Sequence, residues 1–348
     1  MNAPAGATPR TALAPMQDIS TRGFMQLLAR YGAPDYFVTE FFRVHSTSRL
    51  DAEILSCLTH NETGRPVFAQ IIGEDIPAMA AAARELARLP AAGVDLNLGC
   101  PAPKVFRKNV GGGLLRDLPQ VDALLGALRD ALPETKLTVK TRVGFDAAKD
   151  PPALFDTLLA LVNKHGVDLL AVHGRTVRGL YRSAVDYAAI AHAVRTARCP
   201  VVANGDITSA AKAAHVAAET ACAGLMAGRH AVRNPWLFRQ IREHFAGLPV
   251  FRPTLADVRS YIGELAAMLR DSDPAVTSAR LAARMKKFLN FVGAGVDPAG
   301  AFLAAMRRAE DEAALMQVCD THLLAGDKAG ELFADEPYAG AVSRPNCE

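Results

Sequence analysis

Eight short apolar runs, each followed by a stretch of helical character, recur between residues 11 and 229. The stretch from Ile76 to Ala87 and the stretch from Val121 to Leu128 both repeat apolar residues at helical spacing. This alternation predicts an α/β chain, and eight such units predict a (β/α)8 TIM barrel. An open doubly wound sheet is the second choice, because no GxGxxG motif follows the first run. The eight runs are residues 11–16, 36–42, 67–73, 93–100, 137–144, 167–174, 200–207 and 222–229.

The character of the sequence changes after residue 243. Two prolines interrupt residues 244–254, and the pattern from residue 255 to about residue 325 is helical, without strand-like runs. With 348 residues, the chain is long enough for a barrel and a smaller second domain. We therefore predict a flexible N-terminus (1–10), a barrel (11–243), a linker (244–254), an all-helical domain (255–325) and a loose tail (326–348).

Cysteine usage and hydropathy limit the class of protein. The six cysteines form no CxxC pair and no Cys/His metal spacing, which predicts a reduced, cytoplasmic location and no metal site. The first residues lack the apolar region of a signal peptide, and no run approaches the roughly 20 apolar residues of a membrane span. We therefore expect no membrane contact.

Positive charge gathers in the helical region, although the net charge of the chain is only +3. Between Arg280 and Arg308 there are six basic residues and one acidic residue, Asp297. Such a run is as often a solvated helix face as a binding surface. Both interpretations stay open on charge alone.

Polar or small residues stand at the carboxyl ends of the apolar runs. In a TIM barrel these ends meet at one face, where the active site lies. Any one of them could be a hydrogen-bonded core residue, but their alignment predicts a site. The residues are Pro15, Met16, Glu40, Gln70, Asn97, Cys100, Lys140, Arg142, His173, Asn204, Gly205, Asp206, Gly228 and Arg229.

Cys100 follows the fourth run and opens a glycine-rich, basic loop. We expect Pro101 and Pro103 to prevent a helix directly after it, and the glycines at 111–113 to allow a sharp turn. A buried structural cysteine is the more common role for a lone thiol. At the mouth of a barrel, however, the same thiol could take part in catalysis.

Two features predict an anionic ligand. Lys140 and Arg142 share one face of the fifth run, where a buried ammonium without a partner would be costly. The ends of the last two runs, residues 204–206 and 227–229, combine glycines with Arg229, in the region where this fold usually binds phosphate. A phosphorylated cofactor is therefore expected.

Eight motifs in order carry a family resemblance: LAPM, TEFFRV, AQIIG, DLNLGCP, VKTRVG, VHGRT, VANGDI and AGR. Over roughly residues 10–310 the sequence resembles the tRNA-dihydrouridine synthases. The resemblance implies an FMN cofactor, NADPH (or NADH) as a transient reductant, a tRNA partner bound by the helical domain, and Cys100 as the proton donor. It also implies FMN contacts from Pro15, Met16, Gln17, Gln70, Lys140, His173, Asn204, Gly205, Asp206, Gly228 and Arg229.

The implied reaction reduces the C5–C6 double bond of a D-loop uridine, with hydride from FMN to C6 and a proton from Cys100 to C5. The motif TEFFRV and the segment AARMKKFLNF, followed by Arg307, look most like the branch that acts on uridine 16. Phe288 stands where that branch would have tryptophan, and Gln17-Asp18 where Glu-Gly is more usual. Expected substrate and tRNA contacts are Glu40, Asn97, Lys104, Arg142, Arg175, Tyr181, Lys286, Phe288 and Arg307.

Three alternatives stay open at this point. The same chemistry could act at uridine 17 or 20, or a flavin barrel could act on a free pyrimidine, as dihydroorotate dehydrogenases do. A third possibility is a non-catalytic tRNA-binding protein, although both Cys100 and Lys140 are present. We expect a monomer.

Overall fold

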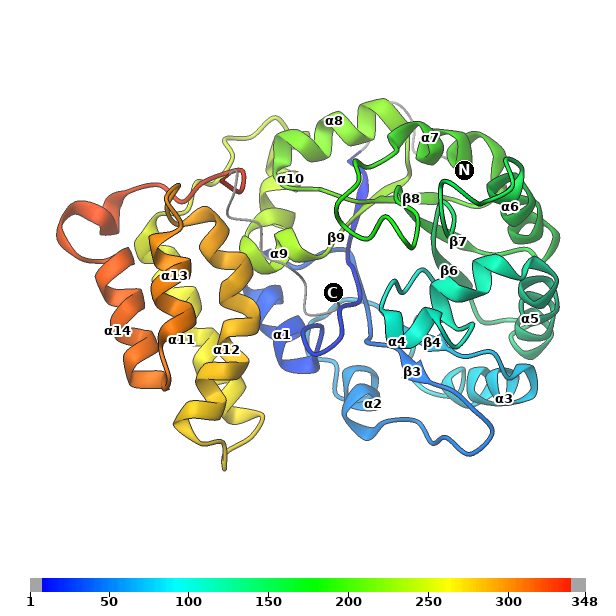
Figure 1. The fold of residues 1–348 in the computed structure, drawn as a ribbon, viewed down its shortest axis with the longest axis horizontal. Helices are drawn as coiled ribbons and strands as arrows, with labels where there is room; N and C mark the ends of the chain where they lie inside the picture. The colour runs from blue at the N-terminus through cyan, green and yellow to red at the C-terminus, as the bar shows by residue number, and fades with distance from the viewer. Residues whose placement is uncertain (1–7, 339–348) are drawn as a thin grey trace.

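Eight parallel strands close into a barrel (Figure 1), which confirms the predicted fold class. The computed structural model describes residues 8–338. β1 pairs with both β2 and β9, and pairing of β2 with β4 closes the ring. The barrel strands are β1 (Arg10–Leu13), β2 (Tyr36–Val38), β4 (Val67–Ile72), β5 (Val94–Leu98), β6 (Leu137–Arg142), β7 (Leu169–His173), β8 (Val201–Asn204) and β9 (Gly224–Ala227).

The second apolar run is split into two strands. After β2 the chain leaves the ladder for three residues and then forms the two-residue strand β3 (Phe42–Arg43), which pairs with the far end of β4. Within the break, the Thr39 hydroxyl accepts a hydrogen bond from the Gln70 backbone N–H at 3.0 Å. The Thr39 hydroxyl thus accepts the hydrogen bond that a backbone carbonyl of β2 would otherwise accept. The chain can therefore turn here and place Glu40 at the carboxyl end of β2.

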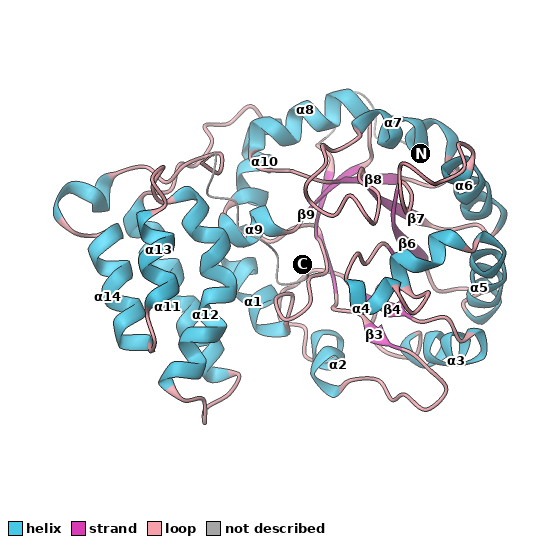
Figure 2. Ribbon diagram, viewed as in Figure 1, coloured by secondary structure: helices cyan, strands magenta, loops and turns pink. Residues whose placement is uncertain are grey.

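Amphipathic helices cover the barrel (Figure 2). Side chains of Thr21, Asp75, Asp117, Asp186 and Ser209 each accept a backbone N–H in the first turn of a helix, which fixes where it begins. The apolar faces predicted in α3 and α5 are buried. The helices of this layer are α1 (Arg22–Gly32), α2 (Ala52–Thr59), α3 (Ile76–Leu86), α5 (Leu118–Ala131), α6 (Leu154–Lys164), α7 (Tyr187–Thr196), α8 (Ala210–Thr220) and α10 (Leu237–Phe245).

Shorter elements follow the carboxyl ends of two strands. They are α4 (Pro103–Phe106) and the 3-10 helix η1 (Gly111–Arg116) after β5, and α9 (Arg229–Arg233) after β9. The prediction that the prolines exclude a helix after Cys100 was wrong. Pro103 is the first residue of α4, a position where the missing N–H of proline costs no helical hydrogen bond.

The C-terminal helices form a bundle beside the barrel, at the left of Figure 1. They are α11 (Leu255–Asp271), α12 (Ser278–Val292), α13 (Ala301–Arg308) and α14 (Glu312–Leu323), with 3-10 helices η2 (Gly293–Gly295) and η3 (Gly326–Gly330). The junction with the barrel is aromatic, because the Tyr31 ring of α1 lies 5.1 Å from Trp236 and 5.3 Å from Tyr261. Barrel and bundle therefore share one hydrophobic core.

Both chain ends differ from the prediction within the described residues. Arg10, expected to be flexible, pairs with Gly224 in the barrel. The predicted loose tail is tied down as far as Tyr338, since Thr254 and Leu332 form a β-bridge and Phe333 is 5% exposed. The mixed composition of the tail gave no indication that one of its aromatic residues, Phe333, would be buried. Residues 1–7 and 339–348, which the same two predictions also covered, lie outside the described part of the chain.

Candidate active site at the carboxyl ends of the strands

Buried polar side chains form a hydrogen-bonded network across β4, β5 and β6. The Gln70 amide donates to Asp95 at 2.7 Å, and Asn97 donates to the Gln70 amide oxygen at 2.8 Å. Thr138 donates to the other Asp95 oxygen at 2.5 Å. Burial raises the pKa of Asp95. The network fixes the orientation of the Gln70 and Asn97 amides.

Asp95 was not among the predicted site residues. It lies two residues before Asn97, on the same face of β5, and is 3% exposed. The twofold period of a strand was the signal that could have identified it.

Lys140 extends the polar network to β8. Its Nζ donates to Asn204 Oδ1 at 3.1 Å, and Asn204 donates to the Met226 carbonyl at 2.7 Å. Burial, and then the charge of Arg142, lower the pKa of Lys140 to about 8. At pH 7 the ammonium is therefore mostly charged, yet the hydrogen bond just described goes to a neutral amide. An electron-rich ligand beside it would stabilise this charge.

Cys100 is held at the edge of the same network. Asn97 Oδ1 accepts the backbone N–H groups of Gly99 (3.0 Å) and Cys100 (2.9 Å), and Gly112 N–H reaches back to the Cys100 carbonyl at 3.3 Å. Gly111 has φ +57°, and a Cβ there would lie 2.8 Å from Ile72. The loop is thus closed at both ends, and the half-buried thiol has a defined place.

Arg142 was predicted to contact RNA, and the structure places it differently. It is 2% exposed, and it donates to the carbonyls of Gly99 (3.0 Å), Thr176 (2.9 Å) and Leu180 (3.0 Å). Its guanidinium therefore joins the Cys100 loop to the loop after β7. Its Nε and Nη1 are thus used to connect these two loops.

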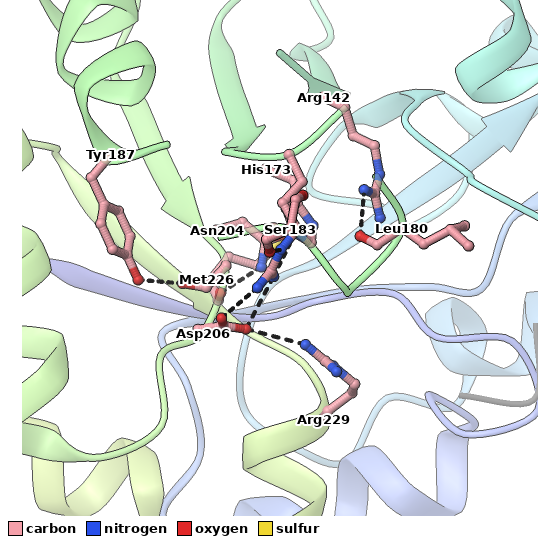
Figure 3. A network of polar contacts seen from close by, with 11 residues as sticks. Arg142, His173, Leu180, Ser183, Tyr187, Asn204, Asp206, Met226 and Arg229 are labelled. Atoms are coloured by element: carbon pink, nitrogen blue, oxygen red, sulfur yellow. Dashed lines mark hydrogen bonds and ion pairs between the residues drawn. The ribbon is translucent and has the colours of Figure 1, made fainter. Parts of the chain in front are cut away.

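Asp206 binds two arginines, Arg175 and Arg229, and Figure 3 shows its contact with Arg229. Arg175 binds it through both Nη atoms, at 2.5 and 3.1 Å, and Arg229 Nη2 lies 3.2 Å from Oδ1. Burial alone would raise the pKa of Asp206, but the hydrogen bond and charge of Arg175, and then the charge of Arg229, hold it below its usual range. The group is therefore a carboxylate.

The two arginines differ in exposure. The Arg175 side chain is 4% exposed and fully engaged with Asp206 and the Ser183 carbonyl, which replaces its predicted RNA contact. The Arg229 side chain is 20% exposed, and its guanidinium lies 4.3 Å from the ring centre of Tyr181. Arg229 is thus the member of the cluster that can face an anion.

The glycines beside this cluster allow a close approach of the backbone. Gly205 has φ +130°, and a Cβ on Gly228 would lie 3.3 Å from both Ala14 Cβ and Met16 Sδ. Gly228 is also the residue directly before α9. Backbone N–H groups at such positions are suited to bind phosphate oxygens.

His173 is a neutral member of the site. It is 6% exposed, and burial together with the charge of Arg142 lowers its pKa well below the usual value. Its ring lies 6.1 Å from Tyr181, and Nε2 lies 3.4 Å from Arg175 Nη1. His173 can therefore act as a hydrogen-bonding group at pH 7, and not as a cation.

The loop after β1 connects the site to the bundle. Pro15 and Met16 are half-buried, and the Gln17 amide donates to Glu40 at 2.8 Å. Burial raises the pKa of Glu40 to about 7, and within the described structure its Oε1 has no hydrogen-bond partner. Lys287 of α12 forms a 2.8 Å ion pair with Asp18.

Of the remaining predicted RNA contacts, two are exposed and two are engaged internally. Lys104 on α4 and Arg307 on α13 are exposed. Lys286 donates to the carbonyls of Arg307 and Ala309, so it satisfies the C-terminal end of α13. Phe288 is 2% exposed, and its ring lies 5.3 Å from Phe24 of α1. The prediction that Phe288 offers a stacking surface is therefore corrected: it belongs to the core between barrel and bundle.

We expect Phe288→Ala to destabilise the fold by about 3–5 kcal/mol, because it leaves a cavity beside Phe24. Chemical denaturation of wild type and variant would measure the loss. Arg307→Ala, at an exposed position of the same bundle, is the control and should change the free energy of unfolding by less than about 0.5 kcal/mol. Unchanged stability of Phe288→Ala with weakened tRNA binding would favour a stacking role instead.

Metal-binding and membrane-spanning features are both absent from residues 8–338. No group of three or more His, Cys, Asp or Glu residues in this range is arranged to hold a metal ion. Among the described helices, none is long and apolar enough to cross a membrane.

Comparison with known proteins identifies the family. The family model "Dihydrouridine synthase (Dus)" matches residues 12–294. The chain is 34% identical over 270 residues to tRNA-dihydrouridine synthase B of Pseudomonas aeruginosa, covering 73% of this chain and 79% of that protein. It is 32% identical over 309 residues to tRNA-dihydrouridine(16) synthase of Neisseria meningitidis, covering 87% of this chain and 91% of that protein.

Solved structures with the same fold are more distant in sequence. Morphinone reductase in complex with tetrahydroNAD aligns with a TM-score of 0.50 at 11% identity, covering 70% of this chain and 88% of that chain. This likeness concerns the barrel fold alone. The family match extends over more than half of the sequence, and the chain therefore belongs to the dihydrouridine synthase family.

Proposed function

We propose that the protein is an FMN- and NADPH-dependent tRNA-dihydrouridine synthase that reduces a D-loop uridine, with uridine 16 as its target. Beyond family membership, the observation that carries the proposal is the placement of Cys100. Its backbone N–H is held by Asn97, and Asn97 belongs to the buried network that lies beside Lys140. One network thus positions a proton donor next to a cation.

The residues present fit FMN. Arg229 offers a partly exposed cation for the phosphate, and the backbone N–H groups at Gly205 and Gly228 are next in sequence to Asp206 and Arg229 of the same cluster. Lys140 offers a desolvated positive charge for the electron-rich edge of the isoalloxazine ring of FMN. Further contacts are assigned to Pro15, Met16, Gln17, Gln70, His173, Asn204 and Asp206. When bound, FMN supplies the hydride for C6 of the uracil ring, and NADPH restores it.

Cys100 supplies the proton for C5. The thiol stands on a loop that is closed by Gly112 and fixed to the loop after β7 by Arg142. Such anchoring restricts where the proton donor can stand, which is what a positioned general acid needs. The target uridine must leave its stack to reach this site. The site therefore binds the base, while the surrounding surface binds the rest of the tRNA.

The choice of uridine 16 rests on the extent of the match. Curated synthase B relatives such as that of Pseudomonas aeruginosa match 73% of this chain, whereas the tRNA-dihydrouridine(16) synthase matches 87%. A match over 309 residues is longer than the 233 residues of the predicted barrel, so it extends beyond the barrel. The bundle is the part that we propose as the tRNA-binding domain, residues 255–325. We assign the recognition of uridine 16 to three residues. Glu40 lies at the rim of the barrel, and Lys104 and Arg307 are exposed.

Two measurements test the proposed function. Oxidised flavin gives purified protein a yellow colour and a visible absorption spectrum, and NADPH-dependent dihydrouridine should form in unmodified tRNA. A colourless protein that gains no activity on adding FMN would falsify the proposal. Activity on free uridine or orotate but not on tRNA would favour the free-pyrimidine alternative.

We expect activity to fall as the pH rises through about 8, because Lys140 then loses its proton. Its folded pKa lies below the usual lysine value of 10.5, so the charge is present below pH 8 and absent above it. The measurement is initial rate of dihydrouridine formation against pH for wild type and Lys140→Arg. The arginine variant keeps its charge, so any remaining activity should decline only at higher pH. An identical alkaline limb in both proteins would assign the decline to another group.

A further inference from the structure

A second arginine of α9, Arg233, holds the loop that follows β8. Arg229 and Arg233 are four residues apart on this helix, so they lie on the same side of it. Arg229 reaches Asp206, and Arg233 Nη2 donates to the Thr208 carbonyl at 3.0 Å. Two residues one helical turn apart therefore bind the loop between β8 and α8, one at Asp206 and the other at Thr208.

Arg233 also holds the end of the described chain, residues 331–338, which we name the C-terminal strap. Its Nη1 donates to the Ala334 carbonyl at 2.7 Å, and its Nη2 donates to the Asp335 carbonyl. The guanidinium lies 5.5 Å from the ring centre of Phe333. The strap contacts the loop directly as well, because Ser209 Oγ donates to Glu336 at 2.5 Å.

The interior setting makes Arg233 an unusual anchor. It is 2% exposed, and burial lowers its pKa to about 10. Its Nε has no hydrogen-bond partner in the described structure, so the three carbonyl contacts, the negative charges of Glu336 and Asp335 and the Phe333 ring offset the desolvation. These contacts join α9, the loop and the strap at a single side chain.

The loop needs such support because its backbone is strained. Asp206 adopts φ +45°, in the left-handed region that disfavours residues other than glycine, and Gly205 precedes it at φ +130°. Such a conformation persists only where the surroundings determine it. The Asp206 end is determined by Arg175 and Arg229, and the Thr208 end by Arg233.

We propose that Arg233, acting with the C-terminal strap, is a positioning residue for the cofactor phosphate. It does not touch the phosphate; it fixes the loop so that its amides and Arg229 keep the arrangement that distinguishes FMN from riboflavin. The inference rests on the proposed function, since it assumes that this loop binds the phosphate of FMN.

The test is the preference of the full-length protein, freed of flavin, for FMN over riboflavin. Titration by flavin fluorescence gives both dissociation constants and their ratio. Lysine cannot span the separate carbonyls of Thr208 and Ala334, so Arg233→Lys should lower the preference for FMN about tenfold, the equivalent of one charge-assisted hydrogen bond. Riboflavin affinity should stay unchanged.

Two further variants keep the result interpretable if Arg233→Lys fails to fold. Glu336→Ala removes an exposed carboxylate from the strap and should lower the preference in the same direction by a smaller factor. Arg242→Lys is the matched control, because Arg242 also donates to a backbone carbonyl, that of Ala33, which lies between α1 and β2 at the amino-terminal end of the barrel, opposite to the loop. It should leave the ratio unchanged.

Three outcomes would overturn the inference. An unchanged ratio in Glu336→Ala and Arg233→Lys would show that the anchor does not matter for the phosphate. A parallel loss of FMN and riboflavin affinity would show a merely structural role. A wild-type protein that does not prefer FMN would overturn the cofactor assignment itself and this inference with it.

Discussion

Cys100→Ala should lose most uridine reduction and keep both FMN and tRNA. The substitution removes the thiol and leaves the backbone N–H that Asn97 holds at 2.9 Å. A positioned general acid contributes about 10²- to 10⁴-fold to rate, so a loss of at least a hundredfold is expected. Dihydrouridine formed in unmodified tRNA is the measurement, with flavin absorbance and tRNA affinity measured on the same samples.

Cys199→Ala is the matched control for this loss. Cys199 is 8% exposed and lies two residues before β8, at the opposite end of the barrel from Cys100. Its loss should cost stability rather than specific activity. Near-normal turnover by Cys100→Ala would remove Cys100 from the mechanism, and loss of flavin from that variant would mean that the thiol supports the cofactor instead.

The barrel was predictable because its signal is local. Each barrel strand falls within one apolar run or extends one residue before it, although the second run also contains β3. The polar residues of the network, Gln70, Lys140 and Asn204, follow from their positions in these runs. Parallel strands bring their carboxyl ends together whatever the loops contain. The same reasoning located Cys100 beside the network.

The roles of the arginines were not predictable, because they depend on partners far away in sequence. Arg142 binds the carbonyls of Thr176 and Leu180, and Arg175 binds Asp206. A basic residue at a strand end looks the same in sequence whether it faces solvent or a carbonyl of another loop. Phe288 of α12 illustrates the same limit, because its burial depends on Phe24 of α1, which is more than 250 residues earlier in the sequence.

Arg307→Ala should weaken tRNA binding, because Arg307 is an exposed cation on the bundle. Its Nε donates to Asn290 at 3.0 Å, and its two Nη groups belong to an exposed side chain that can contact a phosphate. Loss of one phosphate contact should reduce the slope of log affinity against log salt by about 1 and leave NADPH oxidation without tRNA unchanged. Lys286 is not suitable for this test, since removing it would also expose the carbonyls at the end of α13.

Arg88→Ala is the control for the salt slope. Arg88 is also exposed, but it precedes β5 and so lies at the amino-terminal end of the barrel, away from the site. Its loss should leave the slope unchanged. Equal slopes for wild type and Arg307→Ala would remove Arg307 from the tRNA-binding surface.

Deleting the gene should abolish dihydrouridine at position 16 of cellular tRNA, the largest effect expected in the cell. Every D-loop uridine offers the pocket the same base edges, so the choice must come from how the tRNA body is held over the strand ends. The parts of this chain that can hold it are the bundle and the rim, and Lys287 links them through Asp18 on the loop that carries Gln17. Mapping of dihydrouridine in tRNA from the deletion strain, with the wild-type gene returned as the control, decides the position. Loss at 17 or 20 with 16 intact would move the target to that uridine and would leave the proposed role of Cys100 unchanged.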